Sequence, residues 1–490
     1  MRRRWIFLLL LSLGLFLVGV DNSVLYTALP TLRAELDASE LEALWIINAY
    51  PLVLAGFLLG TGTLGDKIGH RRMFTAGLVI FGVASLAAAF APSAWALVAA
   101  RALLGLGAAT MMPATLALVR QTFRDPKELS TAIGVWASVA LLGAAAGPVI
   151  GGALLEHFWW GSVFLINVPV VLVSLIALPA LAPPNEPHPD KHWDFASSLY
   201  ALVAMFGLVM FIKELSAGRS PVVLALSAAA LAIGATVFVL RQRRLTEPLL
   251  TFDVFRDRLF TGGVLTAGLG MFVLAGAELL TTQRFQLSAG FSPLEAGLLT
   301  AAGALASFPT SIAGGALLHR LGFRTLITGG FTVVALGGAA VYAGVAGDTL
   351  WPVIAGMVGV GAGTGAAFGV ASTAIVGSAP RHRAGMAAAV EEVSYEFGTL
   401  LSVTVAGSLI TMFYARQVPD SESFDASAYD ASYLAVMAVL TAVAVLAAAL
   451  TAILFRGNPK ETSYAHEQED ADPAGDRGDR RKVRAVGGDL

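Results

Sequence analysis

The chain has 490 residues, of which 56% are hydrophobic and only 13% are charged, about half the charged fraction of an ordinary soluble domain. So many apolar residues cannot all be buried in a water-soluble globule, so we expect lipid to be the solvent. The net charge of −2 argues against nucleic acid as a partner. The absence of cysteine excludes disulfides, zinc-thiolate sites and thiol nucleophiles.

Fourteen apolar runs are long enough to cross a membrane, since a span takes about 20 mostly apolar residues. In chain order they cover 5–29, 43–63, 73–91, 95–119, 130–153, 161–182, 195–215, 220–240, 258–282, 294–318, 324–345, 349–375, 384–413 and 433–455. The first run follows three arginines, as in a signal peptide, but it is too long and lacks a small-residue cleavage site, so we interpret it as an anchor. The chain is therefore predicted to be an all-α polytopic membrane protein.

The positive residues predict the orientation, because Lys and Arg concentrate in cytoplasmic loops. They cluster before the first span and in alternate loops, whereas the opposite loops hold only Arg33, Lys213, Arg219, Arg284 and Arg416. Both termini are therefore expected in the cytoplasm, and the even number of spans agrees because it places both ends on the same side. The polar segment 457–490 is expected to be a disordered cytoplasmic tail.

An internal repeat divides the chain. Leu41-Glu42-Ala43 after Ser39 recurs as Leu294-Glu295-Ala296 after Ser292, and Gly62–Arg71 aligns with Gly315–Arg324 at the same offset of 253 residues. We predict a six-helix half over 1–182, linkers and two inserted helices over 183–257, and a second six-helix half over 258–456. Transporters built from such halves place their site at the interface between them.

The segment between spans two and three is rich in glycine and charge. Its notable residues are Gly62, Gly65, Asp66, Gly69, Arg71 and Arg72. Glycine permits a tight turn and close helix approach, and Asp66 with the basic residues can make and break ion pairs between domains, so we interpret the segment as a conformational latch. A loop that only sets topology is the alternative, although it needs neither Asp66 nor the glycine spacing.

Two opposite charges lie within spans one and four. Asp21 and Arg101 are at matching depths, ~12 Å and ~9 Å from the outer ends of their spans at the helical rise. Charged groups in hydrocarbon are costly, and a desolvated carboxylate beside a movable cation suits a proton carrier. The alternatives are a static buried ion pair and, for Arg101, a snorkelling side chain.

Three acids, Glu391, Glu392 and Glu396, lie in span thirteen. Glu392 and Glu396 share one helix face, whereas Glu391 points about 100° away. They are candidates for proton or cation binding, with hydrogen bonds between helices as the alternative. Glu278, near the outer end of span nine, is expected to be reached by water and to have no role.

Span five carries small residues and a proline, namely Gly143, Gly147, Pro148, Gly151 and Gly152. They predict a hinge or seal, or else ordinary close helix packing. The aromatic residues Tyr26, Trp45, Tyr50 and Trp136 are candidates to line an apolar, cation-binding cavity, although most membrane aromatics simply pack.

Several of these stretches together resemble the major facilitator superfamily, in particular its 14-span drug:proton antiporters that export quaternary ammonium compounds. They are Val20–Leu25 with Ala28–Pro30, Leu44–Ile47, Gly62–Arg72, Arg101–Gly107, Gly147-Pro148 and Trp160–Pro169. The resemblance implies a monomeric multidrug antiporter of a bacterial plasma membrane, which exports lipophilic cations such as biocides and dyes by using the proton gradient, without a cofactor. It also implies coupling roles for Asp21, Arg101 and the span-thirteen acids.

The sequence departs from the family at two positions. Asn48, a candidate cavity residue, stands where relatives often have a second acid, which implies poor handling of dications. Leu104 replaces the usual glutamine beside Gly105.

Other functions remain alternatives. An exporter of one endogenous metabolite or anionic antibiotic would have basic cavity residues beyond Arg101, and none is found. A receptor or scaffold that has lost transport would fit better if Asp21 or Gly147-Pro148 were missing. An enzyme is disfavoured because no nucleophile-base pair, metal cluster or nucleotide-binding loop occurs outside the spans.

Overall fold

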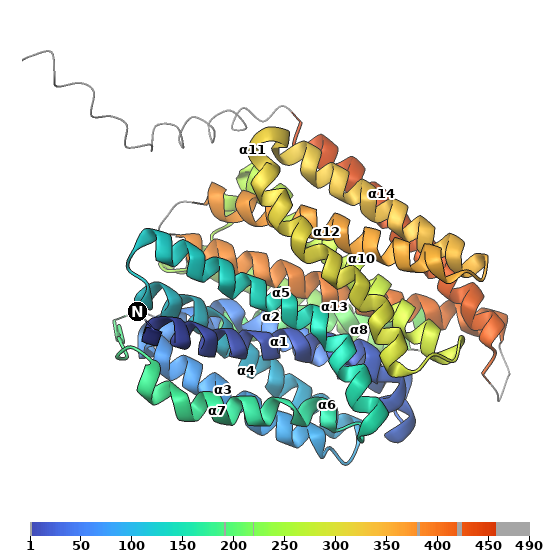
Figure 1. Cartoon of the computed structure of the whole chain (residues 1–490), viewed down its shortest axis with the longest axis horizontal. Helices are drawn as coiled ribbons and strands as arrows, with labels where there is room; N and C mark the ends of the chain where they lie inside the picture. The colour runs from blue at the N-terminus through green and yellow to red at the C-terminus, as the bar shows by residue number, and fades with distance from the viewer. Residues whose placement is uncertain (1, 191–192, 219, 380–382, 419–423, 457–490) are drawn as a thin grey trace, which may run out of the picture.

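The computed structural model describes residues 2–190, 193–218, 220–379, 383–418 and 424–456. The segment 457–490, expected to be disordered, lies outside the described residues. Within them the chain forms α-helices, one 3-10 helix and short connections, with no strand. The long helices run roughly along a common axis, which is horizontal in Figure 1. The all-α prediction is confirmed.

The helices follow one another with few residues between them. The first group is α1 (Arg2–Glu35), α2 (Glu40–Ile68), α3 (His70–Ala89), α4 (Ala94–Thr122), α5 (Pro126–His157), α6 (Ser162–Leu165) and α7 (Asn167–Leu181). The inserted pair is α8 (Phe195–Ala217) and α9 (Pro221–Arg244), followed by the 3-10 helix η1 (Phe252–Arg256). The last group is α10 (Arg258–Leu287), α11 (Pro293–Ala346), α12 (Leu350–Ser378), α13 (Ala384–Gln417) and α14 (Ala426–Leu454).

Twelve helices in the described part of the chain are long and apolar enough to span a membrane. One of them, α11, has 54 residues and a non-helical break at Gly322, with φ 73° and ψ 163°, so it supplies two spans. The 32-residue α5 packs along α1 and supplies one more. The total agrees with the fourteen predicted spans. The sixth span is broken at Ile166 into α6 and α7.

The repeat is visible in local structure. Ser39 and Ser292, 253 residues apart, each begin a helix through a capping box with the glutamate three residues later. Gly69 and Gly322, at the same offset, both have positive φ, 95° and 73°, a conformation that costs glycine little. Equivalent sequence positions therefore shape the chain in the same way in the two halves.

Most helix contacts fall within the two six-helix halves, and the buried cluster of the first half extends to α10 and α13 of the second. In the first half α1 packs on α5, and α4 lies between α2 and α3. In the second half α11 packs on α12 and α14, and α10 packs on α13. The halves meet where α2 faces α13, where α5 faces α11 and where α1 faces α10. Figure 1 shows α5, α13 and α10 in the middle of the bundle.

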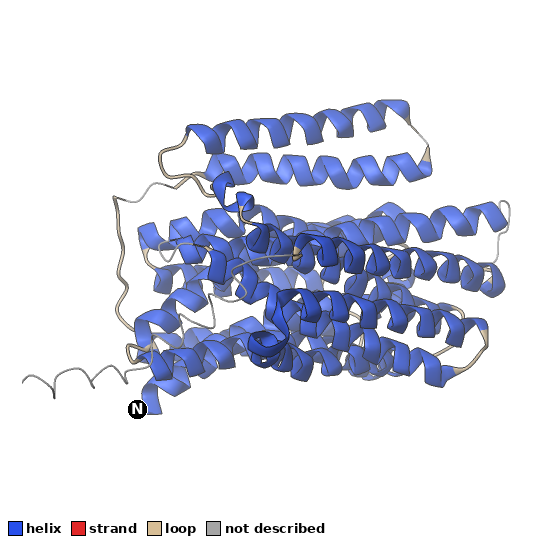
Figure 2. Cartoon of the chain, turned by 90° about the horizontal axis from the view of Figure 1, so that it is seen from above, coloured by secondary structure: helices blue, strands red, loops and turns tan. Residues whose placement is uncertain are grey.

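The inserted helices form a hairpin at one edge of the bundle, the separate pair of helices in Figure 2. α8 packs on both α2 and α13, whereas α9 packs mainly on α8. Trp45 of α2 stacks on Phe206 of α8, with ring centroids 5.0 Å apart and an angle of 19° between the planes. The hairpin therefore covers the seam between α2 and α13.

An ion pair closes the base of this hairpin. Asp194 caps the start of α8, and its carboxylate accepts hydrogen bonds from Arg241 Nε (3.1 Å) and Nη2 (2.9 Å) near the end of α9. Burial raises the pKa of the Asp194 carboxyl, but the hydrogen bonds from Arg241 and Ser197 outweigh burial and hold the pKa below its usual value.

The connections alternate between the two ends of the bundle. The N-terminus and the turn between α2 and α3 lie at one end, which we call the N-terminal end and which is on the left in Figure 1. The connection 36–39, the end of α10 and the start of α14 lie at the opposite end, which we call the vestibule end.

Candidate functional site

Asp21 and Arg101 form an ion pair in the first half. Both residues have 0% exposure, and Arg101 Nη1 donates to one oxygen of the Asp21 carboxylate. Asn167, at the start of α7, donates to the other oxygen at 3.2 Å and also to Ser85 at 3.1 Å. The predicted match in depth therefore corresponds to a direct contact that a third helix reinforces.

Backbone and aromatic contacts hold the Arg101 guanidinium from the other side. Its Nε donates to the carbonyl oxygen of Ile46 at 3.2 Å, and its Cζ lies 4.5 Å from the ring centroid of Tyr50. Gly105, one helical turn away, brings α4 close to α2, because a Cβ there would lie 2.5 Å from the carbonyl oxygen of Tyr50. A cation fixed on three sides needs little reorganisation to hold an anion.

The span-thirteen acids face different neighbours. Glu391 accepts hydrogen bonds from Ser372 of α12 (3.1 Å) and from Tyr395 (3.0 Å). Glu396 faces the first half and accepts a long bond of 3.4 Å from Asn22 of α1, while its other oxygen is buried with no partner among the described residues. Glu392 is half-buried. Glu391 and Glu396 thus face different sides of α13, as their spacing predicts.

Glu278 is more buried than its position near the outer end of the span suggested. The residue is only 8% exposed, in α10, and its carboxylate has no hydrogen bond or ion pair with any described residue. The nearby Arg284 does not neutralise it, because Arg284 forms two bonds with Asp430, at 3.0 and 2.8 Å.

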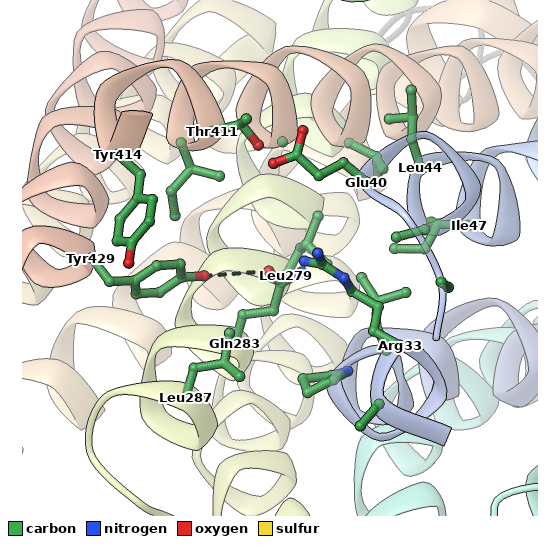
Figure 3. Close-up of a pocket in the computed structure, with 18 of the residues that line it drawn as sticks. Arg33, Glu40, Leu44, Ile47, Leu279, Gln283, Leu287, Thr411, Tyr414 and Tyr429 are labelled. Atoms are coloured by element: carbon green, nitrogen blue, oxygen red, sulfur yellow. Dashed lines mark hydrogen bonds between the residues drawn. The ribbon is translucent and has the colours of Figure 1, made fainter. Parts of the chain in front are cut away.

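A cavity of about 520 Å³ opens at the vestibule end between the two halves. Figure 3 shows the arrangement: Arg33 and Glu40 come from the first half, while Gln283, Tyr414 and Tyr429 come from the second. Tyr429 donates to Gln283 at 3.3 Å. We call this cavity the vestibule.

An apolar layer closes the bottom of the vestibule. It consists of Leu29, Ile47, Leu279 and Val403, one residue each from α1, α2, α10 and α13, and all four are at most 6% exposed. They belong to one packed cluster that includes both halves. Tyr26 lies about one helical turn and Glu396 about two turns further along their helices, and Asn48 directly follows Ile47. The layer therefore separates the vestibule from the buried polar groups.

Three side-chain hydrogen bonds join the two six-helix halves among the described residues. They are Asn22 to Glu396 (3.4 Å), Asn48 to Thr404 (2.9 Å) and Gln286 to the carbonyl oxygen of Thr27 (3.0 Å). All three lie in the middle of the bundle or toward the vestibule end. The side-chain hydrogen bonds between the halves thus lie at the level of Glu396 or between Glu396 and the vestibule.

The segment expected to be a latch is not a loop. Gly62, Gly65 and Asp66 belong to α2, and only Gly69 interrupts the helical path before α3. Asp66 lies 3.1 Å from His70, and Gly62 is close to Pro113. Within the described residues the segment contacts its own half.

A Pro-rich linker after α7 binds this segment. Arg71 donates to the carbonyl oxygen of Pro183 at 3.4 Å, and the backbone N–H of Arg72 donates to Asn185 at 3.2 Å. Asn185 also donates to the carbonyl oxygen of Ile68 at 2.8 Å, and His188 N–H donates to that of Asp66 at 3.0 Å. Among the described residues, Arg71 and the backbone of Arg72 thus bind the linker and not the second half.

The small residues of α5 divide between two partners. A Cβ at Gly143 would lie 2.5 Å from the carbonyl oxygen of Phe16, and one at Gly147 would lie 2.9 Å from that of Val20, so this face packs closely on α1. Gly151 continues the same face, next to Val24.

The other face of α5 meets the second half. A Cβ at Gly152 would lie 2.5 Å from Leu294 Cα, and Pro148 contributes its carbonyl to the close approach of Gly297. Two functions thus share one motif: packing within a half and contact between halves.

The residues expected to line a cavity do not line the vestibule. Trp45 points to α8, Tyr50 lies against Arg101, and Trp136 donates to Thr115 at 3.0 Å within the first half. Asn48 donates to Thr404, and Tyr26 is only 3% exposed. Their role in a substrate cavity stays a prediction.

The sequence reasoning missed Asn167 and Ser85 as partners of the buried ion pair. A signal existed for Asn167, because it is a polar residue inside an otherwise apolar span, but nothing in the spacing related it to Asp21. It also missed the linker residue Asn185, whose contacts depend on the path of the chain after α7.

The comparisons with known proteins agree with this arrangement. The model of the Major Facilitator Superfamily matches residues 11–288 and again 259–486. The chain is 38% identical over 421 residues to the multidrug efflux pump LfrA of Mycolicibacterium smegmatis, and this alignment covers 85% of this chain and 82% of LfrA. It is also 38% identical over 421 residues to the methyl viologen resistance protein SmvA of Salmonella typhimurium, with 85% of each chain covered. The tetracenomycin C resistance and export protein of Streptomyces glaucescens is 34% identical over 85% of this chain and 78% of its own.

A solved structure shares the fold. The bacterial homolog of the human lysosomal transporter Spinster, inward-facing and unoccupied, superposes with a TM-score of 0.66 at 17% identity, over 92% of this chain and 98% of that one. The two six-helix halves, the inserted pair and these matches lead to one conclusion: the chain belongs to the major facilitator superfamily, as a multi-pass membrane protein.

Proposed function

We propose that the protein exports lipophilic cations, such as quaternary ammonium biocides and cationic dyes, across a bacterial plasma membrane in exchange for protons. The main support for this proposal is an imbalance of charge in the middle of the bundle. Among the described residues, the middle of the bundle holds Asp21, Glu278, Glu391, Glu392 and Glu396 but Arg101 as the one cation. Ionised carboxylates are costly to bury without counter-cations, so the site calls for protons or a cationic substrate.

The names of the relatives support the export of small toxic compounds. Three of them are named for multidrug efflux, methyl viologen resistance and tetracenomycin C export. In this chain the apolar walls of the helices around Asp21 and Glu396 supply nonpolar contact, and the carboxylates supply charge. Such sites select loosely, because most of the binding energy comes from burial of apolar surface.

The cycle follows from competition for negative charge. A proton that arrives from outside neutralises Asp21 or a span-thirteen glutamate, which releases the cation outward. When the site faces the cytoplasm, loss of the proton restores the charge that binds the next substrate. The Arg101 guanidinium is positioned to compete with the proton and with the cationic substrate for the carboxylates, because it pairs with Asp21 and also acts electrostatically on Glu396.

We further propose an orientation and a gate. Both termini lie in the cytoplasm, because the N-terminal end carries most of the Lys and Arg. The vestibule then faces outward, and the apolar layer of Leu29, Ile47, Leu279 and Val403 is its gate. The segment 62–72 with linker 183–188 acts as the latch at the cytoplasmic end, and the transporter works as a monomer with halves 1–182 and 258–456.

The test is transport by the purified protein in liposomes with an imposed pH gradient, followed by ethidium fluorescence. We expect gradient-driven flux that falls at least about tenfold in Asp21→Asn, which keeps the shape but removes the titratable charge. Glu156→Gln is the matched control, since Glu156 is an exposed acid of α5. Flux that ignores the gradient, or full flux in Asp21→Asn, would reject the mechanism.

A further inference from the structure

The first helix of each half carries one buried acid near the interface. Asp21 lies in α1 and Glu278 in α10. With the repeat offset of 253 residues, Glu278 corresponds to Leu25, one helical turn from Asp21 toward the vestibule end. The two halves therefore offer a carboxylate at similar but not identical depths.

The two acids differ in what neutralises them. Asp21 has Arg101 and Asn167. At the position of Arg101 the repeat places Ile354, and the whole of α12 contains no charged residue. Glu278 has no hydrogen-bond or ion-pair partner among the described residues. A carboxylate in this setting is stable only when a positive charge joins it from outside the protein.

The helices packed against α10 carry several titratable groups. Tyr26 of α1 is within electrostatic range of Glu278 and of Glu396 of α13, and the hydroxyl of Tyr433 of α14 lies 3.0 Å from that of Thr281. Arg33 of α1 and Tyr429 of α14 line the vestibule together with Leu279 and Gln283 of α10. In α11 the nearest charged residue at this end, Glu295, caps its own helix. Arg284 is committed to Asp430. Among the described residues, no cation of these helices forms a hydrogen bond or an ion pair with Glu278.

Glu278 also lies near polar groups of the first half. Tyr26 lies within electrostatic range of Glu278, Glu396 and Arg101. Tyr50, in turn, lies within range of Asp21 and Glu396. The carboxylates of the two halves thus face a shared group of polar side chains. On α10, Leu279, the next residue, belongs to the apolar layer below the vestibule.

We propose that Glu278 is a further cation-binding carboxylate of the transport path, in the second half and next to the vestibule gate. Its occupant is a single positive charge, either a proton or the charged group of the exported cation. The proposal rests on the proposed function, since only an exchange of cations fills and empties such a site. It extends that function by adding a position between the Asp21 pair and the vestibule.

The experiment measures binding and proton release in the same sample. Purified full-length protein in weakly buffered detergent is titrated with tetraphenylphosphonium at constant pH, and the affinity and the number of protons released per bound cation are recorded. Wild type is compared with Glu278→Gln, a neutral substitution of the same shape, with Asp21→Asn, and with the exposed-site control Glu156→Gln.

Two results support the proposal and identify the occupant. If Glu278 holds a proton, Glu278→Gln releases about one proton fewer per bound cation with affinity changed by less than about threefold. If Glu278 holds the substrate charge, affinity falls at least about tenfold. Glu278→Asp, which retains the acid, is expected to restore the wild-type pattern in part and serves if the Gln variant does not fold.

Other results overturn it. Unchanged affinity together with unchanged proton release in folded Glu278→Gln shows a static buried acid. Failure of the proposed function has a different signature, because wild type would then bind no tetraphenylphosphonium, or Asp21→Asn would behave as wild type, whatever Glu278 does.

Discussion

Asn48 and Thr404, 356 residues apart in the chain, form a hydrogen bond of 2.9 Å across the interface between the halves, and Asn48 is completely buried. Asn48 was expected to line a cavity, where it stands in place of an acid. Its side chain instead joins α2 to α13 just below the apolar layer. The interface between the halves is thus held by direct polar contact as well as by apolar packing.

We predict that loss of this hydrogen bond weakens the contact between the two halves below the vestibule. In a double-mutant cycle of Asn48→Ala and Thr404→Val, the coupling energy should be about 0.5–1.5 kcal/mol, as for hydrogen bonds between membrane helices. Thermal unfolding of the purified variants measures it. A coupling energy of zero would show that the contact does not hold the halves together.

The apolar layer should act as a barrier to protons. Leu279→Ala removes a 2%-exposed side chain from this layer and leaves space between the vestibule and Glu278. We expect a proton leak without substrate, several-fold above wild type in liposomes, and a loss of stability of about 2–4 kcal/mol. The control is Leu298→Ala on α11, where the leucine is 54% exposed and should leave the leak unchanged.

The two faces of the α5 motif should respond differently to a methyl group. Gly143→Ala places a Cβ against Phe16 within the first half, so we expect a loss of stability of about 1–3 kcal/mol. Gly152→Ala places a Cβ against Leu294 of the second half, so it should mainly lower ethidium transport by hindering closure at the vestibule end. Thermal unfolding and transport are measured on both variants; equal effects on both properties would contradict the division.

The inserted hairpin should lose stability in acid. The depressed pKa of Asp194 means that its ion pair with Arg241 contributes fully above the unfolded value of about 3.9. The contribution disappears as the pH falls through the folded value. The melting temperature of wild type should therefore exceed that of Asp194→Asn at pH 7, and the gap should close as the pH falls below the folded pKa of Asp194. A gap independent of pH would exclude this ion pair as its source.

Much of the architecture could be predicted because lipid imposes simple rules on the chain. The fourteen spans follow from run length, and the repeat follows from Ser39 and Ser292 with their capping glutamates. Matching depth was enough to pair Asp21 with Arg101. The break in α11 at Gly322 was implicit in the alignment with Gly69.

The sequence could not predict which side of each helix faces which neighbour. The helices are apolar around most of their circumference, so the hydrophobic pattern gives little indication of which side meets a neighbour. Trp45 therefore turned out to face α8 rather than a cavity. The basic residues after Gly69 bind linker 183–188, because that linker returns beneath α2 and α3, a path that no local pattern specifies.

The low charge content of the chain determined by itself that the protein lies in a membrane and that its few interior acids are costly. Only the tertiary structure decided how each acid is accommodated: Asp21 has an arginine and an asparagine from two other helices, Glu396 has one weak donor, and Glu278 has none among the described residues. The physical reason is that the cost of burying a charge is a property of the residue, whereas the groups that offset this cost come from helices far apart in the sequence.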